Sequence, residues 1–301
     1  MPSTSPPIPT VSRRSAYFIL ALTIVVWASS FAAIRYVLQQ LDPMSMTTIR
    51  LIVAALFMGA VAASFRLPLP SRQDWPRLAA AAFLGFSAYH YLLNVGTQTV
   101  PAGQASFIIA TAPIWTALLA WRFLDETLSL KNGLGLLLGL GGVALMSLDQ
   151  ATGTITLGSL LILGAAMCAG ANLVLTKDLL ARTRALSVAA YSAIIGALPF
   201  VANLPWTWSA SADLQWSGWL VLFYLGIVAM GIGYWLSSVA LAALPANQVA
   251  RALLLIPPTA ALIAWLTLGE TPSTMLFIAG PLILLGVWLG RRPPVADTTS
   301  S

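Results

Sequence analysis

The chain has 301 residues, of which 58% are hydrophobic and only 8% are charged. A soluble globular domain carries about a quarter charged residues, so this composition excludes a soluble enzyme, a disordered chain and a nucleic-acid-binding protein. The formal net charge of +6 does not indicate nucleic-acid binding, because fifteen basic residues spread over this length form no basic face. The single cysteine, Cys168, excludes an internal disulfide and a thiol-based metal cluster. The sequence therefore predicts an integral membrane protein.

Ten apolar segments each approach the roughly 20 residues that a membrane-spanning helix requires. They cover residues 15–38, 44–64, 76–97, 102–123, 131–148, 157–177, 186–205, 218–241, 246–268 and 273–290. Very short loops join them. The first segment ends in Arg35 and lacks the small-residue cleavage pattern of a signal peptide, so we expect it to be retained. The predicted fold class is all-α, with ten transmembrane helices.

The positions of lysine and arginine predict the orientation of these segments. Basic residues cluster before the first segment, after the tenth, and around every second loop between them except the one near Pro245, which is uninformative. They are Arg13, Arg14, Arg66, Arg72, Arg77, Arg122, Lys131, Lys177, Arg182, Arg184, Arg291 and Arg292. The alternate loops, around Asp42, Thr99, Thr152, Asp213 and Glu270, hold no lysine or arginine. This pattern predicts that both termini are cytoplasmic.

The second half of the chain repeats the first at an offset of 144 residues. The segment PAGQ…P…LLAW…ET recurs without a gap as PANQ…P…LIAW…ET. Its matched pairs include Pro101 with Pro245, Gln104 with Gln248, Pro113 with Pro257, Trp121 with Trp265, and Glu126 with Glu270. Each half then holds five spans, residues 15–149 and 157–290, flanked by a disordered cytoplasmic tail (1–14) and a second tail (291–301). Because five is odd, the halves are predicted to be inverted, an arrangement typical of secondary transporters.

Several features together resemble the EamA family of the drug/metabolite transporter superfamily, over about residues 15–290. They are Trp27-Ala28-Ser29-Ser30-Phe31 with Arg35, Pro43 followed by Arg50, the repeated Pro113…Glu126 and Pro257…Glu270 segments, and the glycine-rich stretch 135–142. The resemblance implies a basket-like fold in the inner membrane, with spans one to four and six to nine around a central cavity. Spans five and ten would lie at the periphery. For bacterial members it also implies export of amino acids or related metabolites.

Two arginines lie at membrane depth, where a charged side chain is expensive and needs a reason. Arg50 lies about six residues into the second span from the outer side, and Arg251 at a similar depth in the ninth from the cytoplasmic side. Each could face the cavity and attract a carboxylate. Each could instead extend its long side chain to the membrane interface or cap nearby carbonyl groups.

His90 is the only histidine and lies in the third span, between Tyr89 and Tyr91, with Asn94 one turn further on. Its unperturbed pKa lies close to neutral, so it could couple transport to protons; alternatively it forms a hydrogen bond within a helix-packing layer. At the repeat offset, Tyr234 and Trp235 correspond to His90 and Tyr91. Aromatic residues with a polar edge suit either a substrate cavity or ordinary helix packing.

The predicted substrate-binding residues share a position within a span and a side chain that is polar or aromatic. They are Trp27, Ser30, Arg50, Tyr89, His90, Tyr91, Asn94, Tyr234, Trp235 and Arg251. Glu126 and Glu270 end spans four and nine and are interpreted as structural. Pro113 and the pair Pro257-Pro258 predict kinks. The small-residue spacing at Gly135, Gly139, Gly286 and Gly290 indicates close helix contact, within the chain or in a dimer.

No aspartate or glutamate lies in the central part of any span, which favours a zwitterion or a carboxylate-bearing anion over an organic cation. No phosphate-binding loop and no metal-ligand cluster occurs, so no ATP hydrolysis, metal or cofactor is expected. We interpret the chain as an alternating-access exporter of amino acids or related small metabolites, a monomer or weak homodimer, with one half rocking against the other. The alternatives are a sugar-phosphate or nucleotide-sugar exchanger of the same superfamily, and a non-transporting membrane enzyme or scaffold.

Overall fold

The computed structural model of the chain describes residues 12–123, 130–147, 155–180, 182–244, 249 and 252–289. Within these ranges the regular structure is helical throughout. The first part contains α1 (Arg13–Val37), α2 (Pro43–Ser64), η1 (Arg72–Asp74), α3 (Trp75–Ala82), η2 (Phe83–Ala88), α4 (Tyr89–Thr97), α5 (Ala102–Ile109), α6 (Ala112–Phe123) and α7 (Leu130–Ser147).

The second part follows the same plan. It contains α8 (Leu157–Leu180), α9 (Ala185–Val201), α10 (Leu204–Ala210), α11 (Trp216–Phe223), η3 (Tyr224–Ile232), α12 (Gly233–Ala243), η4 (Leu253–Leu255), α14 (Ile256–Leu268) and α15 (Thr274–Leu289). Several consecutive elements are pieces of one span: α3, η2 and α4 cover the third predicted segment, and α11, η3 and α12 cover the eighth.

Six helical segments in the described ranges are long and apolar enough to cross a membrane. A seventh is formed if α9 and α10, which meet at a bend of 77°, are counted as one span, and three further apolar helices are shorter. The chain is therefore a multi-pass membrane protein. The count of ten spans and the inversion of the two halves stay predictions.

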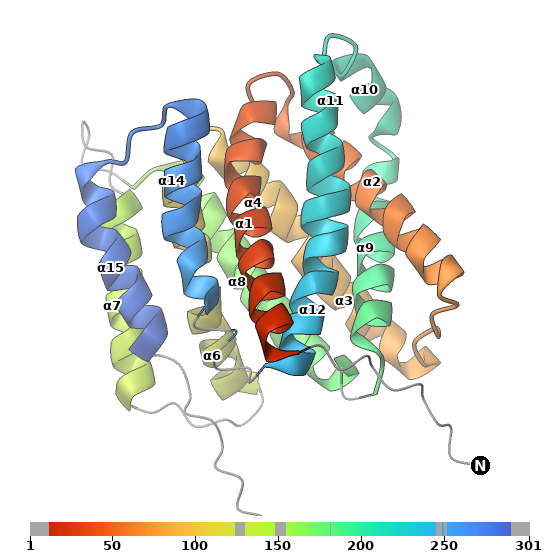
Figure 1. Cartoon of the computed structure of the whole chain (residues 1–301), viewed down its shortest axis with the longest axis horizontal. Coiled ribbons are helices and arrows are strands. Elements are labelled where there is room, and N and C mark those ends of the chain that lie inside the picture. Colours follow the sequence, from red (N-terminus) through yellow and green to blue (C-terminus); the bar gives the residue numbers. More distant parts are fainter. Residues whose placement is uncertain are drawn as a thin grey trace, which may run out of the picture.

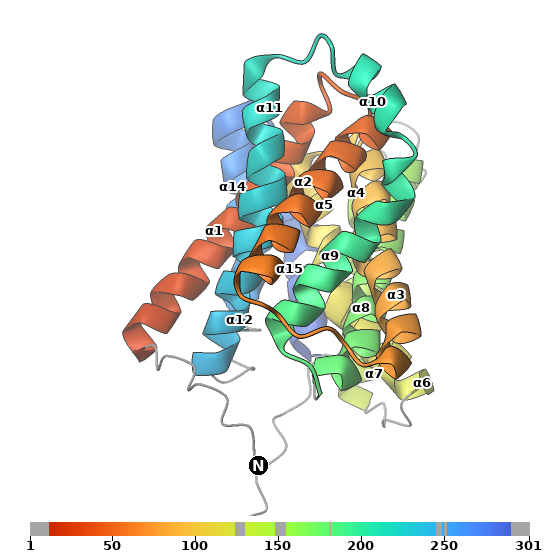
Figure 2. The same cartoon turned by 90° about the vertical axis from the view of Figure 1, so that its right-hand side faces the viewer.

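The upper end of the bundle, as drawn in Figures 1 and 2, is where α1 ends and α2 begins. The connections from α10 to α11 and from α14 to α15 also lie there, whereas α1 begins and α12 ends at the lower end. In Figure 2, α1 and α12 diverge at the lower end from α3 and α6.

Two spans contain a stretch of π-helix, which the sequence did not predict. These stretches are η2 in the third span and η3 in the eighth. Adding 144 to the bounds of η2 gives 227–232, which lies within η3, so the distortion follows the sequence repeat. Wider π-helical turns leave some backbone carbonyl groups without their usual helical partner and are frequent at functional sites.

The α-helical pattern is interrupted next to both repeated prolines, where kinks were expected. In the fourth span, α5 ends at Ile109 and α6 begins at Ala112, with Pro113 in its first turn. In the ninth, the short helix η4 precedes α14, which carries Pro257 in its first turn. Proline has no amide hydrogen and fits best in the first turn of a helix, which is where Pro113 and Pro257 lie.

The helices α7 and α15 pack against each other at one edge of the bundle (Figure 1). A Cβ atom placed on Gly286 would collide with the backbone of Gly135 and Gly139. The small-residue spacing in the sequence therefore brings two helices of the same chain into contact.

Candidate functional site

A cavity of about 500 Å³ lies among helices from both halves of the chain. Most of its lining is apolar: Phe31, Ile34, Leu93, Ile109, Ala110, Ala112, Pro113, Leu173, Ala229, Met230, Leu253, Leu254, Ile256 and Pro257. The polar and polar-edged aromatic lining residues are Trp27, Ser30, Arg50, Tyr89, His90, Ser106 and Tyr234. None of the described residues of α7 or α15, which cover the fifth and tenth predicted segments, lines it.

Arg50 is the charged residue of this lining. The carboxylate of Asp42 accepts hydrogen bonds from the amides of Met44 and Ser45, both at 2.9 Å, and so starts the helix that carries Arg50. Arg50 itself is only 4% exposed. Its Nε and Nη1 atoms are buried and have no hydrogen-bond partner among the described residues. Burying a charged donor without an acceptor is strongly unfavourable. Among the cavity residues, the guanidinium group of Arg50 therefore has the most to gain from binding an acceptor group.

His90 lies at the start of α4, directly after the π-helical stretch η2. It is 3% exposed, and neither ring nitrogen has a hydrogen-bond partner in the described part of the chain. Its ring packs edge-on against Tyr89, with centroids 4.7 Å apart, and against Phe86 at 6.2 Å. One alternative from the sequence was that His90 forms a hydrogen bond within a helix-packing layer. The described residues show no such bond.

An aromatic wall joins the two halves beside Arg50. Trp27 and Tyr234 meet edge to face at 5.7 Å, and Phe86 stacks on Tyr234 at 5.8 Å. Trp27 also donates a hydrogen bond from Nε1 to the carbonyl oxygen of Ala229, at 3.1 Å. Ser30 donates to the carbonyl of Val26 in its own helix, at 2.9 Å.

Three described residues of the predicted site, Tyr91, Asn94 and Trp235, are not in this lining. Tyr91 is 39% exposed and Trp235 is 52% exposed. Successive helical residues point about 100° apart, so the neighbours His90 and Tyr234 face the cavity while these two do not. Asn94 is buried and donates from Nδ2 to Thr47 Oγ1 at 2.8 Å. Arg251 lies outside the described residues.

Sequence reasoning missed the apolar majority of the lining. On α1, the lining residues Ser30, Phe31 and Ile34 follow Trp27 by three, four and seven residues. That spacing marks one side of a helix. In a membrane protein the other sides are also apolar, so hydrophobicity alone did not distinguish the cavity side.

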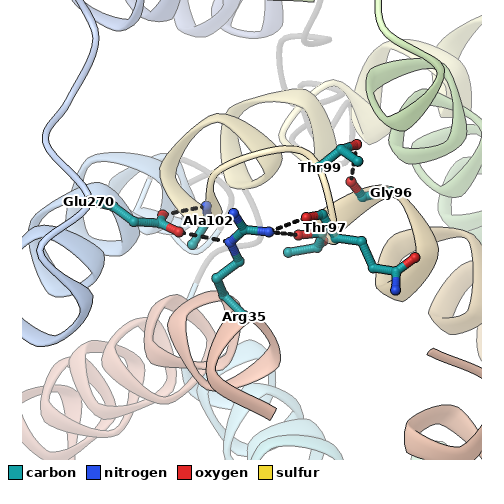
Figure 3. A network of polar contacts seen from close by, with 7 residues as sticks. Arg35, Gly96, Thr97, Thr99, Ala102 and Glu270 are labelled. Carbon is teal, nitrogen blue, oxygen red and sulfur yellow. Dashed lines mark hydrogen bonds and ion pairs between the residues drawn. The ribbon is translucent and has the colours of Figure 1, made fainter. Parts of the chain in front are cut away.

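Above the cavity, Arg35 and Glu270 form a polar network with the backbone of α4 and α5 (Figure 3). The Nε of Arg35 donates to Glu270 Oε1 at 3.0 Å, and its Nη1 donates to the carbonyl oxygens of Thr97, at 2.8 Å, and of Gln98. The second oxygen of Glu270 accepts from the amide of Ala102 at 2.8 Å. We refer to these contacts as the Arg35–Glu270 network.

A left-handed turn places Glu270 in this network. Gly269 ends α14 with φ of 70°, a conformation that residues with a Cβ adopt at a cost. The amides of Gly269 and Glu270 then donate back to the carbonyls of Trp265 and Ala264, at 3.1 and 3.4 Å. Glu270 thus pairs with a cation in the last turn of α1, in agreement with the structural interpretation of the sequence. Its counterpart Glu126 lies outside the described residues.

Comparison with known proteins agrees with this architecture. The model of the EamA-like transporter family matches the chain twice, at residues 14–148 and 156–290. A protein of Streptantibioticus cattleyicolor named as a probable terminal-alkyne amino-acid exporter is 33% identical over 277 residues, which is 92% of this chain and 93% of that protein. A probable amino-acid metabolite efflux pump of Escherichia coli is 26% identical over 290 residues, covering 93% of this chain and 95% of that protein.

A solved structure titled only "Crystal structure of protein" has the same fold. Its TM-score is 0.64 at 21% sequence identity, and the match covers 92% of this chain and 96% of that one. The family and the relatives are named as transporters and not as enzymes, and a transporter of this kind acts on small molecules. The two family matches, the multi-pass helical fold and the central cavity together show that this chain belongs to the EamA-like transporter family.

Proposed function

We propose that this transporter exports carboxylate-bearing small metabolites, amino acids among them, by alternating access across the bacterial inner membrane. The observation that carries the proposal is Arg50, a buried guanidinium group with two unpartnered donor atoms in the lining of a 500 Å³ cavity. A guanidinium group binds a carboxylate through two parallel hydrogen bonds. The names of the amino-acid exporter and efflux pump among the relatives support this substrate class.

The other lining residues would hold the body of the substrate. Trp27, Tyr89 and Tyr234 offer large aromatic surfaces with a polar edge, which suit a small amphipathic molecule. Ser30 and His90 add polar atoms beside Arg50. No aspartate or glutamate is among the described lining residues, so the cavity favours negative over positive groups.

We further propose that the chain forms ten spans in two inverted five-helix units, residues 15–149 and 157–290, with both termini cytoplasmic. Three features that obey the 144-residue offset support the repeat: the matched sequence, the π-helical stretches and the helix breaks at Pro113 and Pro257. The distribution of basic residues supports the orientation. The packing of Gly286 on Gly135 and Gly139 within the chain supports a monomer.

Flux measurements in liposomes test the proposal. A panel of labelled amino acids, sugar phosphates and organic cations is offered to the purified parent protein and to Arg50→Ala and Arg50→Lys. We expect uptake of amino acids by the parent, strong loss in Arg50→Ala and partial loss in Arg50→Lys, which keeps the charge but not the paired donors. Lys131→Ala, which removes an exposed cation of α7, is the matched control. Parent-like amino-acid flux in Arg50→Ala would refute the role of Arg50.

A further inference from the structure

We propose that the Arg35–Glu270 network is the latch that closes the upper end of the cavity and that it opens once in each transport cycle. This inference rests on the proposed alternating access. Neither Arg35 nor Glu270 is among the residues that line the cavity. They would therefore act by positioning the helices rather than by touching the substrate.

The network lies directly above the cavity on three helices. On α1, Ile34 lines the cavity and Arg35 follows it; on α4, Leu93 lines the cavity and Thr97 lies one turn higher. On α5, Ser106 lines the cavity and Ala102 is the corresponding residue one turn higher. At about 1.5 Å per residue, four residues correspond to about 6 Å.

The same contacts cross from one side of the cavity to the other. Arg35 ends α1 and Glu270 follows α14, and these helices pack together on one side. α5, whose first amide binds Glu270, packs against both of them. The carbonyl groups of Thr97 and Gln98 belong to the end of α4, which packs mainly against α8 (Figure 3). Any movement that separates α1, α14 and α5 from α4 at the upper end must break the bonds of Arg35 to these carbonyl groups.

An ion pair at the lower end lies on one side of the cavity. The lining reaches Leu253 and Leu254, which precede α14 and lie at its opposite end from Glu270. The ion pair of Arg182 with Asp74, at 2.7 Å, joins the turn after α8 to η1. Because α3 packs on α8, this pair holds together one side of the cavity and does not bridge it.

The charges of the network match the helix ends that they contact. Arg35 donates to carbonyl groups at the C-terminus of α4, where the helix dipole favours a cation. Glu270 accepts from the first amide of α5, where the dipole favours an anion and where Pro101 supplies no side-chain cap. Both oxygens of Glu270 are used, so glutamine, with one acceptor oxygen, cannot replace it fully.

The exposure of the pair suits a bond that must form and break. The side chains of Arg35 and Glu270 are 27% and 19% exposed. Separating a fully buried ion pair strongly destabilises a protein, and a fully exposed ion pair contributes little to its stability. Partial exposure lets water replace the lost bonds as the latch opens.

Cysteine labelling tests the latch. Cys168 is replaced by alanine, and Ala110, a half-buried lining residue, is replaced by cysteine. The rate of reaction with a membrane-impermeant maleimide is then measured from each face in vesicles of known orientation. We expect Glu270→Gln to raise the rate from the upper face by about tenfold, the effect of losing roughly one charge-assisted hydrogen bond. Asp213→Asn, which changes an exposed carboxylate at the same end, should leave the rate unchanged.

Two further variants make the test decisive. Arg35→Lys keeps the charge and should raise the rate less than Glu270→Gln, and it replaces that variant if Glu270→Gln does not fold. The exchange Arg35→Glu with Glu270→Arg should not restore the parent rate, because a carboxylate at 35 would face the carbonyls of Thr97 and Gln98. Parent-like labelling from the upper face in Arg35→Lys and in folded Glu270→Gln would overturn the proposal.

The labelling readout does not depend on the substrate. If amino-acid flux is absent but labelling changes as expected, the proposed substrate is refuted and the latch proposal stands. Normal flux with unchanged labelling would refute the latch and leave the proposed function.

Discussion

The indole nitrogen of Trp27 donates a hydrogen bond to the carbonyl oxygen of Ala229, 202 residues further along the chain, at 3.1 Å. Ala229 lies in the π-helical stretch η3, and the bond supplies a partner for a carbonyl within a distorted helix. It joins α1 to the eighth span beside the cavity, so the same residue forms the cavity wall and fixes the geometry of that wall.

Replacing Trp27 by phenylalanine should therefore destabilise the protein. Phenylalanine keeps an aromatic ring but removes the indole donor to the Ala229 carbonyl, and a hydrogen bond of this kind contributes about 0.5–1.5 kcal/mol. Thermal unfolding in detergent should show a lower Tm. The control is Trp208→Phe, since Trp208 is 80% exposed, and an equal loss in both variants would contradict the role of the bond.

Replacing Arg50 by methionine should separate stability from function. The variant removes a buried charge that has two donor atoms without a partner among the described residues, and it fills the space with an apolar chain, so Tm should be unchanged or higher. Amino-acid flux should fall about tenfold or more, because a hydrogen bond to a charged group contributes about 1.5–3 kcal/mol. A variant that loses both stability and flux would indicate that Arg50 serves the fold rather than the substrate.

Replacing Gly286 by alanine should weaken the packing of α15 on α7. The new Cβ would meet the backbone of Gly135 and Gly139, which cannot move aside as a flexible side chain can. Overpacking of this kind costs about 1–3 kcal/mol and should appear as a lower Tm. Gly141→Ala in α7 is the control, because a Cβ there meets nothing within 4 Å.

Replacing Gly269 by alanine tests the turn that places Glu270. Space is available for the Cβ, so the expected loss, about 1–2 kcal/mol, comes only from the left-handed backbone with φ of 70°. We expect a lower Tm. Gly133→Ala, which has equal space and a helical backbone, should lose no stability. Equal Tm values for the two variants would show that the turn is not strained.

The sequence predicted the helical segments closely and the site only in part. The described helices coincide with the predicted apolar ranges, and the helix breaks lie at Pro113 and Pro257, because hydropathy and proline geometry act locally. It did not predict η2 and η3, since no residue type encodes a π-helical turn. The sequence also did not reveal that His90 and Tyr234 face the cavity while their neighbours Tyr91 and Trp235 point away from it.

The amino-acid sequence by itself determined that this protein lies in a membrane, where its helices run and to which family its pattern belongs. Those properties follow from apolar length, from charge in the loops and from a repeated motif. Only the tertiary structure decided that Nε and Nη1 of Arg50 are buried with no partner in the part of the chain that it describes, and that Arg35 pairs with Glu270, 235 residues away. The physical reason is that membrane helices are apolar on every side, so the side that faces a cavity or a distant partner is set by packing between helices.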